Sequence, residues 1–470
     1  MSKRKRAGII IACIISIIVL VGIAASCIDF SGSKFYTLTI TISPSGAGSV
    51  SPSASEYQSG TQATLTASPA IGYTFDHWGG SASGTASTIT ITMDSDKSVT
   101  AYFEAAPGVL FSDDFSDESS GWDTFDVSNG QAIYRDGYFY MKDYTDDWTI
   151  YSESQHYFTD FVLEAETWLA GGTDDNWYGV MCRYMNSDNF YAFLIRSDGR
   201  YGIEKAVDGN RATLIEPTYS SYINQGMDAV NLIHIACIGS SLSLSVNGHL
   251  LATVTDDSFT DGDIALVADA VGGTFTEVAF DNIIVTEPEV LFSDDFSDES
   301  SGWNTANDSY GQIIYRDGYF YIKDYTDGLT LFSRSHHYFT DFILEVETWL
   351  VDGTDNTRHV LYYRYSDVDN HYGFSISADG YYRVWKEVDN YITSLVGLTY
   401  SSYINQGVGA VNLIHIACIG SSLSLSVNGH LLWEGTDATF TGGDIALGAA
   451  AEAGTFTEVA FDNIIVYSVG

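Results

Sequence analysis

The chain has 470 residues, of which 61 are acidic and 20 are basic, so its formal net charge at pH 7 is −41. A surface this acidic repels phosphate, which excludes nucleic acid as a binding partner. The length is enough for several separate hydrophobic cores.

The first 27 residues are predicted to be an export signal or a membrane anchor. Four basic residues at positions 3–6 precede an uninterrupted small and apolar stretch, Ala7 to Ser26, and basic flanks stay on the inner side of a membrane. The letters AASC that end the stretch resemble a bacterial lipobox with Ala24 where Leu is usual, which implies lipid attachment at Cys27. Lipidation and an uncleaved transmembrane helix are both open, and either would tether the exported chain to the outer face of the membrane.

A linker over residues 28–34 leads to a predicted small all-β domain over residues 35–105. Strand-like alternation occurs at 36–42, 62–66, 88–93 and 98–103, between Gly, Pro, Ser and Asp turns. The letters TISPSGAGSVSPS, GYTFDHWGG and MDSDKSVTAYF resemble the divergent internalin B-type bacterial repeat. This resemblance implies a small core around Trp78 and a role as a stalk or spacer, without catalytic residues.

The rest of the chain carries one domain twice. The 23 residues Ala229 to Leu251 recur unchanged at Ala410 to Leu432, and the segments VLFSDDFSDESSGW and GTFTEVAFDNIIV open and close both units. Each unit, 109–287 and 290–468, is too long for a solenoid repeat and long enough to bury its own core. We therefore predict two tandem domains.

Each unit is predicted to be nearly all β. Residues Leu242 to Val246 alternate strictly, Asn247-Gly248 is a strong hairpin turn, and His249 to Val254 supply the returning strand. Other strands are expected at 131–134, 138–142, 161–168, 178–184, 189–196, 202–206, 263–268 and 274–285. Apart from one helical turn near Tyr219, no helix is expected. This pattern predicts a two-sheet jelly-roll sandwich.

Several motifs of both units resemble the concanavalin A-like, laminin G-like superfamily. In the first unit they are the DDF opening, YFTDFVLEAETW, SDNFYAFLI, LSLSVNGHLL, DGDIAL and the FDNIIV ending, and the second unit matches most of them. The resemblance implies an all-β chain with two tandem concanavalin A-like sandwiches. It does not identify an activity, because this fold carries lectins, adhesion modules, hydrolases and scaffolds.

Two carboxylates on one strand are the best candidates for catalysis. Glu164, Glu166 and Trp168 share a strand face, as do Glu345, Glu347 and Trp349. Residues two apart on a strand lie roughly 6.5 to 7 Å apart, near the lower limit for inverting glycosidases. Both carboxylates, however, would lie side by side rather than flank a bond, and the glutamate, aspartate, glutamate constellation of laminarinase-type hydrolases is absent. We assign no catalytic residue and keep a glycoside hydrolase-like enzyme as an alternative.

Aromatic residues make up 14% of the chain, and flat rings next to a few planar polar groups can bind sugars. The candidate ligand-binding residues are Trp177, Arg183, Tyr191, Arg364 and Tyr372. The alternative for any single ring is that it fills the sandwich interior. Since Arg358 replaces Trp177 in the second unit, the two units need not share a ligand.

A structural calcium ion near the terminal strands is implied by the superfamily resemblance. Asp281 and Asp462 of the FDNIIV segments match that position, with Asp113 and Asp114, or Asp294 and Asp295, as possible neighbours, and calcium prefers such hard oxygen ligands. The alternative is that these aspartates cap turns.

The exported cysteines predict no disulfide common to both units, because Tyr363 stands where the first unit has Cys182. Cys237 lies in an apolar run and is predicted to be a buried free thiol. Together these features predict a membrane-tethered surface protein whose sandwiches bind extracellular polysaccharide or a surface glycan without catalysis. A structural or protein-adhesion module is the second alternative.

Overall fold

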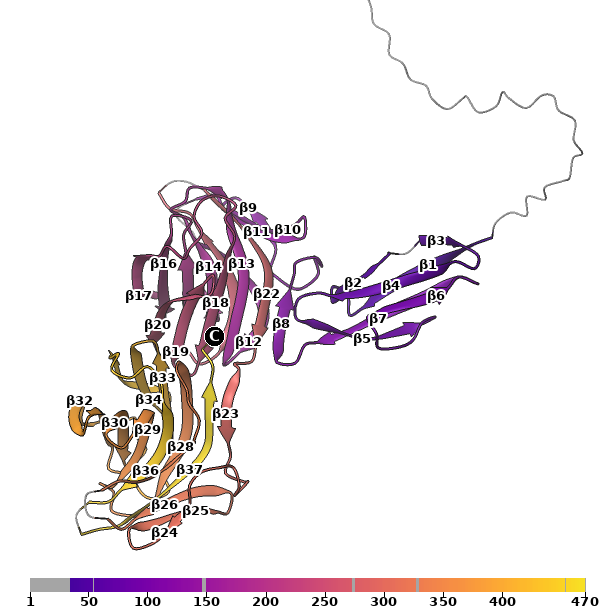
Figure 1. Cartoon of the computed structure of the whole chain (residues 1–470). Coiled ribbons are helices and arrows are strands. Elements are labelled where there is room, and N and C mark those ends of the chain that lie inside the picture. Colours follow the sequence, from indigo (N-terminus) through magenta and orange to yellow (C-terminus); the bar gives the residue numbers. More distant parts are fainter. Residues whose placement is uncertain are drawn as a thin grey trace, which may run out of the picture.

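The computed structural model describes residues 34–53, 55–145, 149–272, 275–326, 329–452 and 454–469. All the regular secondary structure of these residues is β-strand. The strands form a narrow two-sheet domain followed by two larger sandwiches (Figure 1). The leader with Cys27 lies outside the described residues. Within the described part, no helix is long and apolar enough to cross a membrane.

The first domain packs a four-stranded sheet against a three-stranded one. The first sheet has the order β3 (Ser55–Gln58), β1 (Phe35–Ser43), β7 (Lys97–Ala105), β5 (Tyr73–Gly80), and the second has the order β2 (Gly48–Ser51), β4 (Gln62–Pro69), β6 (Thr88–Thr92). Trp78 is buried between them, and its indole Nε1 donates to the carbonyl of Ala86 at 2.9 Å. The core therefore forms around the tryptophan that the repeat resemblance implied.

The first sandwich packs a nine-stranded sheet against a six-stranded sheet. The nine-stranded sheet runs β20 (His249–Thr255), β19 (Ser241–Val246), β18 (Asn231–Ile238), β13 (Phe161–Gly172), β22 (Thr276–Thr286), β11 (Tyr138–Asp143), β10 (Gly130–Arg135), β9 (Phe125–Val127), with β8 (Val109–Asp113) paired to β22. The six-stranded sheet runs β12 (Thr149–Phe158), β21 (Gly262–Asp269), β14 (Trp177–Asn186), β15 (Asn189–Ile195), β16 (Arg200–Val207), β17 (Asn210–Tyr219).

The second sandwich repeats this arrangement strand for strand. Its nine-stranded sheet runs β24 (Ala306–Asn307), β25 (Gly311–Arg316), β26 (Tyr319–Asp324), β37 (Thr457–Tyr467), β28 (Phe342–Gly353), β33 (Asn412–Ile419), β34 (Ser422–Val427), β35 (His430–Thr436), with β23 (Val290–Asp294) paired to β37. Its six-stranded sheet runs β27 (Leu331–Arg334), β36 (Asp444–Ala450), β29 (Arg358–Asp367), β30 (Asn370–Ser377), β31 (Tyr381–Val388), β32 (Tyr391–Tyr400).

Side-chain alternation explains where each core lies. In β13, Phe161, Leu163 and Ala165 have no exposed surface, whereas Glu164 and Glu166 face outward. This confirms the face assignment made from the sequence. Each sandwich buries its own apolar cluster between its two sheets, and the all-β sandwich fold is confirmed.

Several strands of the first sandwich, the longest of them β12 and β17, are not among those expected from the sequence. β12 is interrupted by a register shift that includes Gln155, whose φ is 64°, and such a bulge hides a strand from a period-two search. β17 is an edge strand whose residues are mostly exposed, so it shows no core-facing alternation. Tyr219 ends this strand, and the expected helical turn is absent among the described residues around it.

The two sandwiches touch through the outer faces of their nine-stranded sheets. A small apolar cluster between them comprises Val162, Ala236 and Ile238 of the first and Ile343, Ala417, Ile419, Tyr467 and Val469 of the second. The hydroxyls of Ser240 and Ser426 lie 2.7 Å apart, and His430 Nδ1 lies 3.0 Å from Asp257 Oδ2. The two copies are therefore in contact rather than joined by a linker alone.

Candidate functional site

The outer face of the six-stranded sheet in the first sandwich carries a groove of about 800 Å³. Met181, Tyr184 and Phe190 form its floor, and the half-buried Tyr151 stands beside Tyr184 with ring centres 5.3 Å apart. These side chains belong to a second apolar cluster that is separate from the sandwich core. The outer face of this sheet is therefore aromatic rather than polar.

A bulge in β14 places the aromatic floor of the groove. Strict alternation would put Tyr184 on the same face as Val180 and Cys182, which are in the core. The register shifts between Met181 and Tyr184, and Arg183 between them has a φ of 47°. Both Met181 and Tyr184 consequently face outward. The period-two pattern of the sequence gives no sign of this shift.

Polar groups surround the apolar floor. Asp123, Glu153, Asp269 and Arg211 line the groove. Burial raises the pKa of Asp269 to about 6, although the Thr149 hydroxyl donates to it at 3.3 Å. Burial also raises the pKa of Glu153, and the negative charge of Asp123 adds to this rise. The groove thus offers rings, carboxylates and one guanidinium to a ligand.

The same face of the second sandwich has a different lining. Phe332, Tyr362, Tyr365 and Trp385 form its apolar cluster. Arg334, Ala450 and Trp385 stand at the positions of Glu153, Asp269 and Glu204. The duplication has therefore kept the aromatic character of this face and has exchanged its acidic groups.

Trp177 lies on the outer face of the first six-stranded sheet, as a ligand-binding residue would. It packs against the outer apolar cluster, and the Arg196 guanidinium lies 5.0 Å from its ring centre. Trp177 is not among the residues that line the groove. Its contact with sugar stays a prediction.

Arg183 and Arg364 are buried inside the fold. Arg183 is 1% exposed; its Nη1 donates to the carbonyls of Gly239 and Phe259 at 2.8 Å, and its Nη2 donates to Asp160 Oδ1 at 3.2 Å. Arg364 is 0% exposed and makes the equivalent bonds in the second sandwich. Their donors hold loops together and do not face the solvent, because the bulge turns them inward.

Tyr191 and Tyr372 belong to the two sandwich cores. Their hydroxyls donate to Asp256 at 2.6 Å and to Asp437 at 2.7 Å. Burial raises the pKa of Tyr372 to about 12. Of the five ligand-binding residues predicted from the sequence, only Trp177 lies on the outer face of a six-stranded sheet, and the groove is lined by other residues, among them Met181, Tyr184 and Phe190.

Asp281 lies on the outer face of the nine-stranded sheet, opposite Glu166 in the strand register. Burial, and then the charges of Glu166, Asp114 and Asp113, raise its pKa to about 6. Its equivalent Asp462 is shifted in the same direction by burial first and then by its acidic neighbours. The acidic neighbours implied by the superfamily resemblance are therefore close enough to affect both carboxyls.

The side chains around Asp281 do not by themselves supply enough ligands for a calcium ion. In the described part of the chain, no three Asp, Glu, His or Cys side chains lie close enough together to hold a metal ion. Asp281 Oδ1 already accepts a bond from the backbone N–H of Asn282 at 2.8 Å. Calcium would have to take most of its ligands from backbone carbonyls and water, so calcium at Asp281 and Asp462 stays a prediction.

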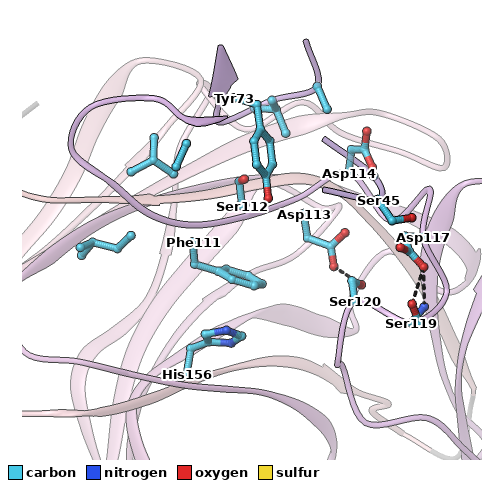
Figure 2. A pocket seen from close by; sticks show the side chains of 16 residues that line it. Ser45, Tyr73, Phe111, Ser112, Asp113, Asp114, Asp117, Ser119, Ser120 and His156 are labelled. Carbon is cyan, nitrogen blue, oxygen red and sulfur yellow. Dashed lines mark hydrogen bonds between the residues drawn. The ribbon is translucent and has the colours of Figure 1, made fainter. Parts of the chain in front are cut away.

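A second cavity, of about 440 Å³, lies between the first domain and the first sandwich (Figure 2). Tyr73 comes from the first domain, and Asp113, Asp117 and His156 come from the sandwich. Asp113 accepts bonds from the Trp122 indole at 2.8 Å, the Ser120 hydroxyl at 2.5 Å and the Phe115 N–H at 2.7 Å. The Asp113 carboxylate thus stabilises the turn after β8. The cavity is a gap at the boundary between the two domains.

The glutamates considered for catalysis lie on the opposite side of the sandwich from the groove. Glu164 faces His234 across the strand pair, and Asn282 Nδ2 donates to Glu166 Oε2 at 3.3 Å. In the second sandwich, His415 Nδ1 lies 3.2 Å from Glu345 Oε1 at the contact with the first sandwich. The two glutamates of each strand lie next to each other on one outer face.

One family model matches part of the chain. Residues 38–107 match the divergent InlB B-repeat domain. This covers the first domain and leaves both sandwiches unassigned. No curated protein matches the chain.

Solved structures similar to the chain each correspond to about one sandwich. The carbohydrate binding module CBM66 from Bacillus subtilis is 18% identical with a TM-score of 0.28, and the match covers 36% of this chain and 96% of the module. A protein of unknown function with a galectin-like fold from Bacillus subtilis is 13% identical with a TM-score of 0.31, and the match covers 38% of this chain and 96% of that protein. The catalytic domain of a laminarinase from Thermotoga petrophila is 10% identical with a TM-score of 0.31, covering 39% and 98%. Matches at this level do not identify a ligand or a reaction.

Proposed function

We propose that this chain is a membrane-tethered surface protein that binds an extracellular polysaccharide or other surface glycan without catalysis. The observation that carries the proposal is the groove of about 800 Å³ on the outer face of the first six-stranded sheet, with its aromatic floor and polar edge. Concave sites with apolar walls and a few polar groups are where ligands bind. The basic residues 3–6 followed by the apolar stretch Ala7 to Ser26 support the tether.

The separation of Glu153 and Asp269 favours binding over hydrolysis by this pair of acids. Glu153 pairs with Ala265 and Thr149 pairs with Asp269, so Glu153 and Asp269 are separated by four residues along the strands. At the usual rise this is roughly 13 Å, beyond the ~5–9.5 Å that separates the two carboxyls of glycosidases. These two acids therefore suit hydrogen bonding to sugar hydroxyls better than acid–base chemistry on one bond.

Two binding faces in one chain would strengthen attachment to a polymer. Once one sandwich is bound, the second meets the same polysaccharide at a high effective concentration. The contact between the sandwiches holds the two faces at a fixed spacing. Weak binding by each sandwich would then be sufficient for firm attachment of the whole chain.

The proposal is tested by glycan binding of the full-length chain and of a Tyr151→Ala variant. Tyr151 is half-buried at the groove, so its loss should lower affinity at least tenfold while the melting temperature falls little. The exposed Tyr338, which is 73% exposed, provides a matched control, and Tyr338→Ala should bind as the parent does. Failure of the parent to bind any glycan on a broad array would contradict the proposal.

Two further assays distinguish the alternative functions, a glycoside hydrolase and a protein-adhesion module. Release of reducing sugar from a polysaccharide panel, lost on Glu164→Gln or Glu166→Gln, would instead indicate a glycoside hydrolase. Retention of proteins from an envelope extract together with a blank glycan array would indicate a protein-adhesion module.

A further inference from the structure

The second sandwich carries two neighbouring arginines on the outer face of its six-stranded sheet. Arg358 begins β29 and Arg383 lies in β31, two strands away. Ser377 pairs with Arg358 and Ser375 pairs with Arg383, so small side chains of β30 lie between the two guanidiniums. The chain has only 20 basic residues against 61 acidic ones, so the two arginines form a local positive patch on an acidic protein.

The Arg383 side chain packs against an aromatic ring, but its positive charge is not balanced by a nearby carboxylate in the described part of the chain. Its guanidinium carbon lies 4.5 Å from the Trp385 ring centre, which orients it over the sheet. Among the described residues, no carboxylate lies within ion-pair distance of Arg383, whereas Arg358 Nη2 lies 3.0 Å from Glu452 Oε1. Burial lowers the pKa of Arg383, and the charge of Arg358 lowers it further. A half-buried cation next to a second cation lacks a counter-anion.

The nearby acidic groups are either hydrogen-bonded already or lie further along the strand. Glu452 accepts the bond from Arg358, and the Ser377 hydroxyl donates to Asp379 at 2.5 Å. Glu387 lies four residues further along β31, roughly 13 Å from Arg383 at the usual rise per residue. These contacts leave the Arg383 guanidinium as the donor that a ligand can reach.

The first sandwich does not have this arrangement. Gly202 stands at the position of Arg383, Trp177 at that of Arg358 and Leu194 at that of Ser375. Its groove has carboxylates instead, among them Glu153 and Asp269. The duplicated faces therefore differ in charge where a ligand would lie.

We propose that the second sandwich binds a saccharide through a single oxyanion, a carboxylate or a sulfate ester, which Arg383 and Arg358 hold together. The inference rests on the proposed glycan-binding function and adds the chemical class of one ligand. Guanidinium forks match the geometry of such oxyanions and give short charge-assisted hydrogen bonds. Because the whole chain carries a charge of −41, a densely charged polyanion would be repelled, and a sparsely charged glycan fits best.

The test compares binding of the full-length chain to carboxylated, sulfated and neutral glycans on one array. A second copy of the array is first treated so that every carboxylate is reduced to a hydroxymethyl group. We expect binding to acidic spots to fall at least tenfold on Arg383→Gln, and neutral spots bound by the first sandwich to keep their signal. Arg316→Gln is the matched control, since it removes one charge from the other sheet of the same sandwich while Lys323 still pairs with Glu458.

Each outcome supports or contradicts a specific statement. Loss of signal after carboxyl reduction assigns a carboxylate, and signal on sulfated spots alone assigns a sulfate; both support the inference. Binding that persists on neutral spots with no effect of Arg383→Gln on acidic spots overturns the oxyanion inference and leaves the proposed function intact. A completely blank array overturns both.

Discussion

Two buried arginines show how far a residue's role depends on its surroundings. Arg183 and Arg364 occur in strands poor in positive charge, which makes them candidates for sugar binding. In the fold, each guanidinium lies under the sheet and bonds to loop carbonyls and to one aspartate. A buried charge is tolerated only when its donors are used in this way.

Arg183→Gln should destabilise the first sandwich without a direct effect on ligand binding. The change leaves the carbonyls of Gly239 and Phe259 without their donor, and each such loss costs about 1–3 kcal/mol. We expect about 3 kcal/mol less stability in urea unfolding. Arg135→Gln, which removes an exposed ion pair with Glu277, should cost less than about 1 kcal/mol. Weaker glycan binding by a fully stable Arg183→Gln protein would contradict this expectation and support the sugar-binding role predicted from the sequence.

Asp281 should make stability depend on pH in the direction opposite to that of an ordinary salt-bridged acid. Its pKa in the folded protein, about 6, lies above its ordinary value of 3.8, so its favourable contribution is complete only below about pH 4 and is lost as the pH rises through 6. At pH 7 the ionised carboxylate is unfavourable. After allowance for solvent screening of this partly exposed group, the cost is about 1 kcal/mol.

Asp281→Asn should therefore raise the melting temperature at pH 7 and leave it unchanged near pH 4. Asn can still accept the bond from the N–H of Asn282, so little else changes. The same scan with added calcium tests the metal prediction. A calcium-dependent gain in the parent that the variant lacks would show that Asp281 holds the ion, and the variant would then be the less stable protein in calcium.

At the scale of single elements, identical sequences have different environments in the two copies. The corner between β18 and β19 has the letters IGSS, and so does the corner between β33 and β34. Gly239 and Gly420 at these corners have φ values of 52° and 56°. A Cβ on Gly239 would lie 2.6 Å from His415 Nδ1 of the second sandwich, whereas a Cβ on Gly420 would have no neighbour within 4 Å.

Gly239→Ala should consequently loosen the contact between the sandwiches, and Gly420→Ala should not. Both changes bring the same backbone strain, about 1–2 kcal/mol for an L-residue in this region, so the second variant is the control for strain. Small-angle scattering should show a larger radius of gyration, and proteolysis at residues 287–289 should be faster, for Gly239→Ala alone. Equal behaviour of the two variants would mean that the corner does not matter for the contact.

Edge strands also differ between the copies. β17 has Arg211, Glu216 and Pro217, which discourage pairing with another strand, and β32 has Ile392, Gly397 and Leu398 at the same positions. Ile392 and Leu398 are about 60% exposed. The second sandwich therefore has the less protected edge.

At the scale of the whole molecule, the chain is a narrow β-domain followed by two joined sandwiches (Figure 1). Each of the three domains has its own apolar core. Cys182, Cys237 and Cys418 are buried free thiols that form no disulfide, so the stability of the domains comes from these cores. This confirms the prediction made for Cys237. The outer faces of the six-stranded sheets lie away from the contact between the sandwiches, so both can serve for binding in one chain.

The sequence by itself determined the duplication, the all-β class, the core faces of strands such as β13 and the hairpin at Asn247-Gly248, whose φ values are 52° and 76°. These features depend on local periodicity and turn chemistry, which can be read directly from the residues. Only the tertiary structure decided that Tyr184 faces outward and Arg183 inward, because a bulge in β14 changes the face of every later side chain. It also decided which residues of distant strands form the groove and the arginine pair, because strand order and register are set by packing of the whole sandwich and not by any one segment.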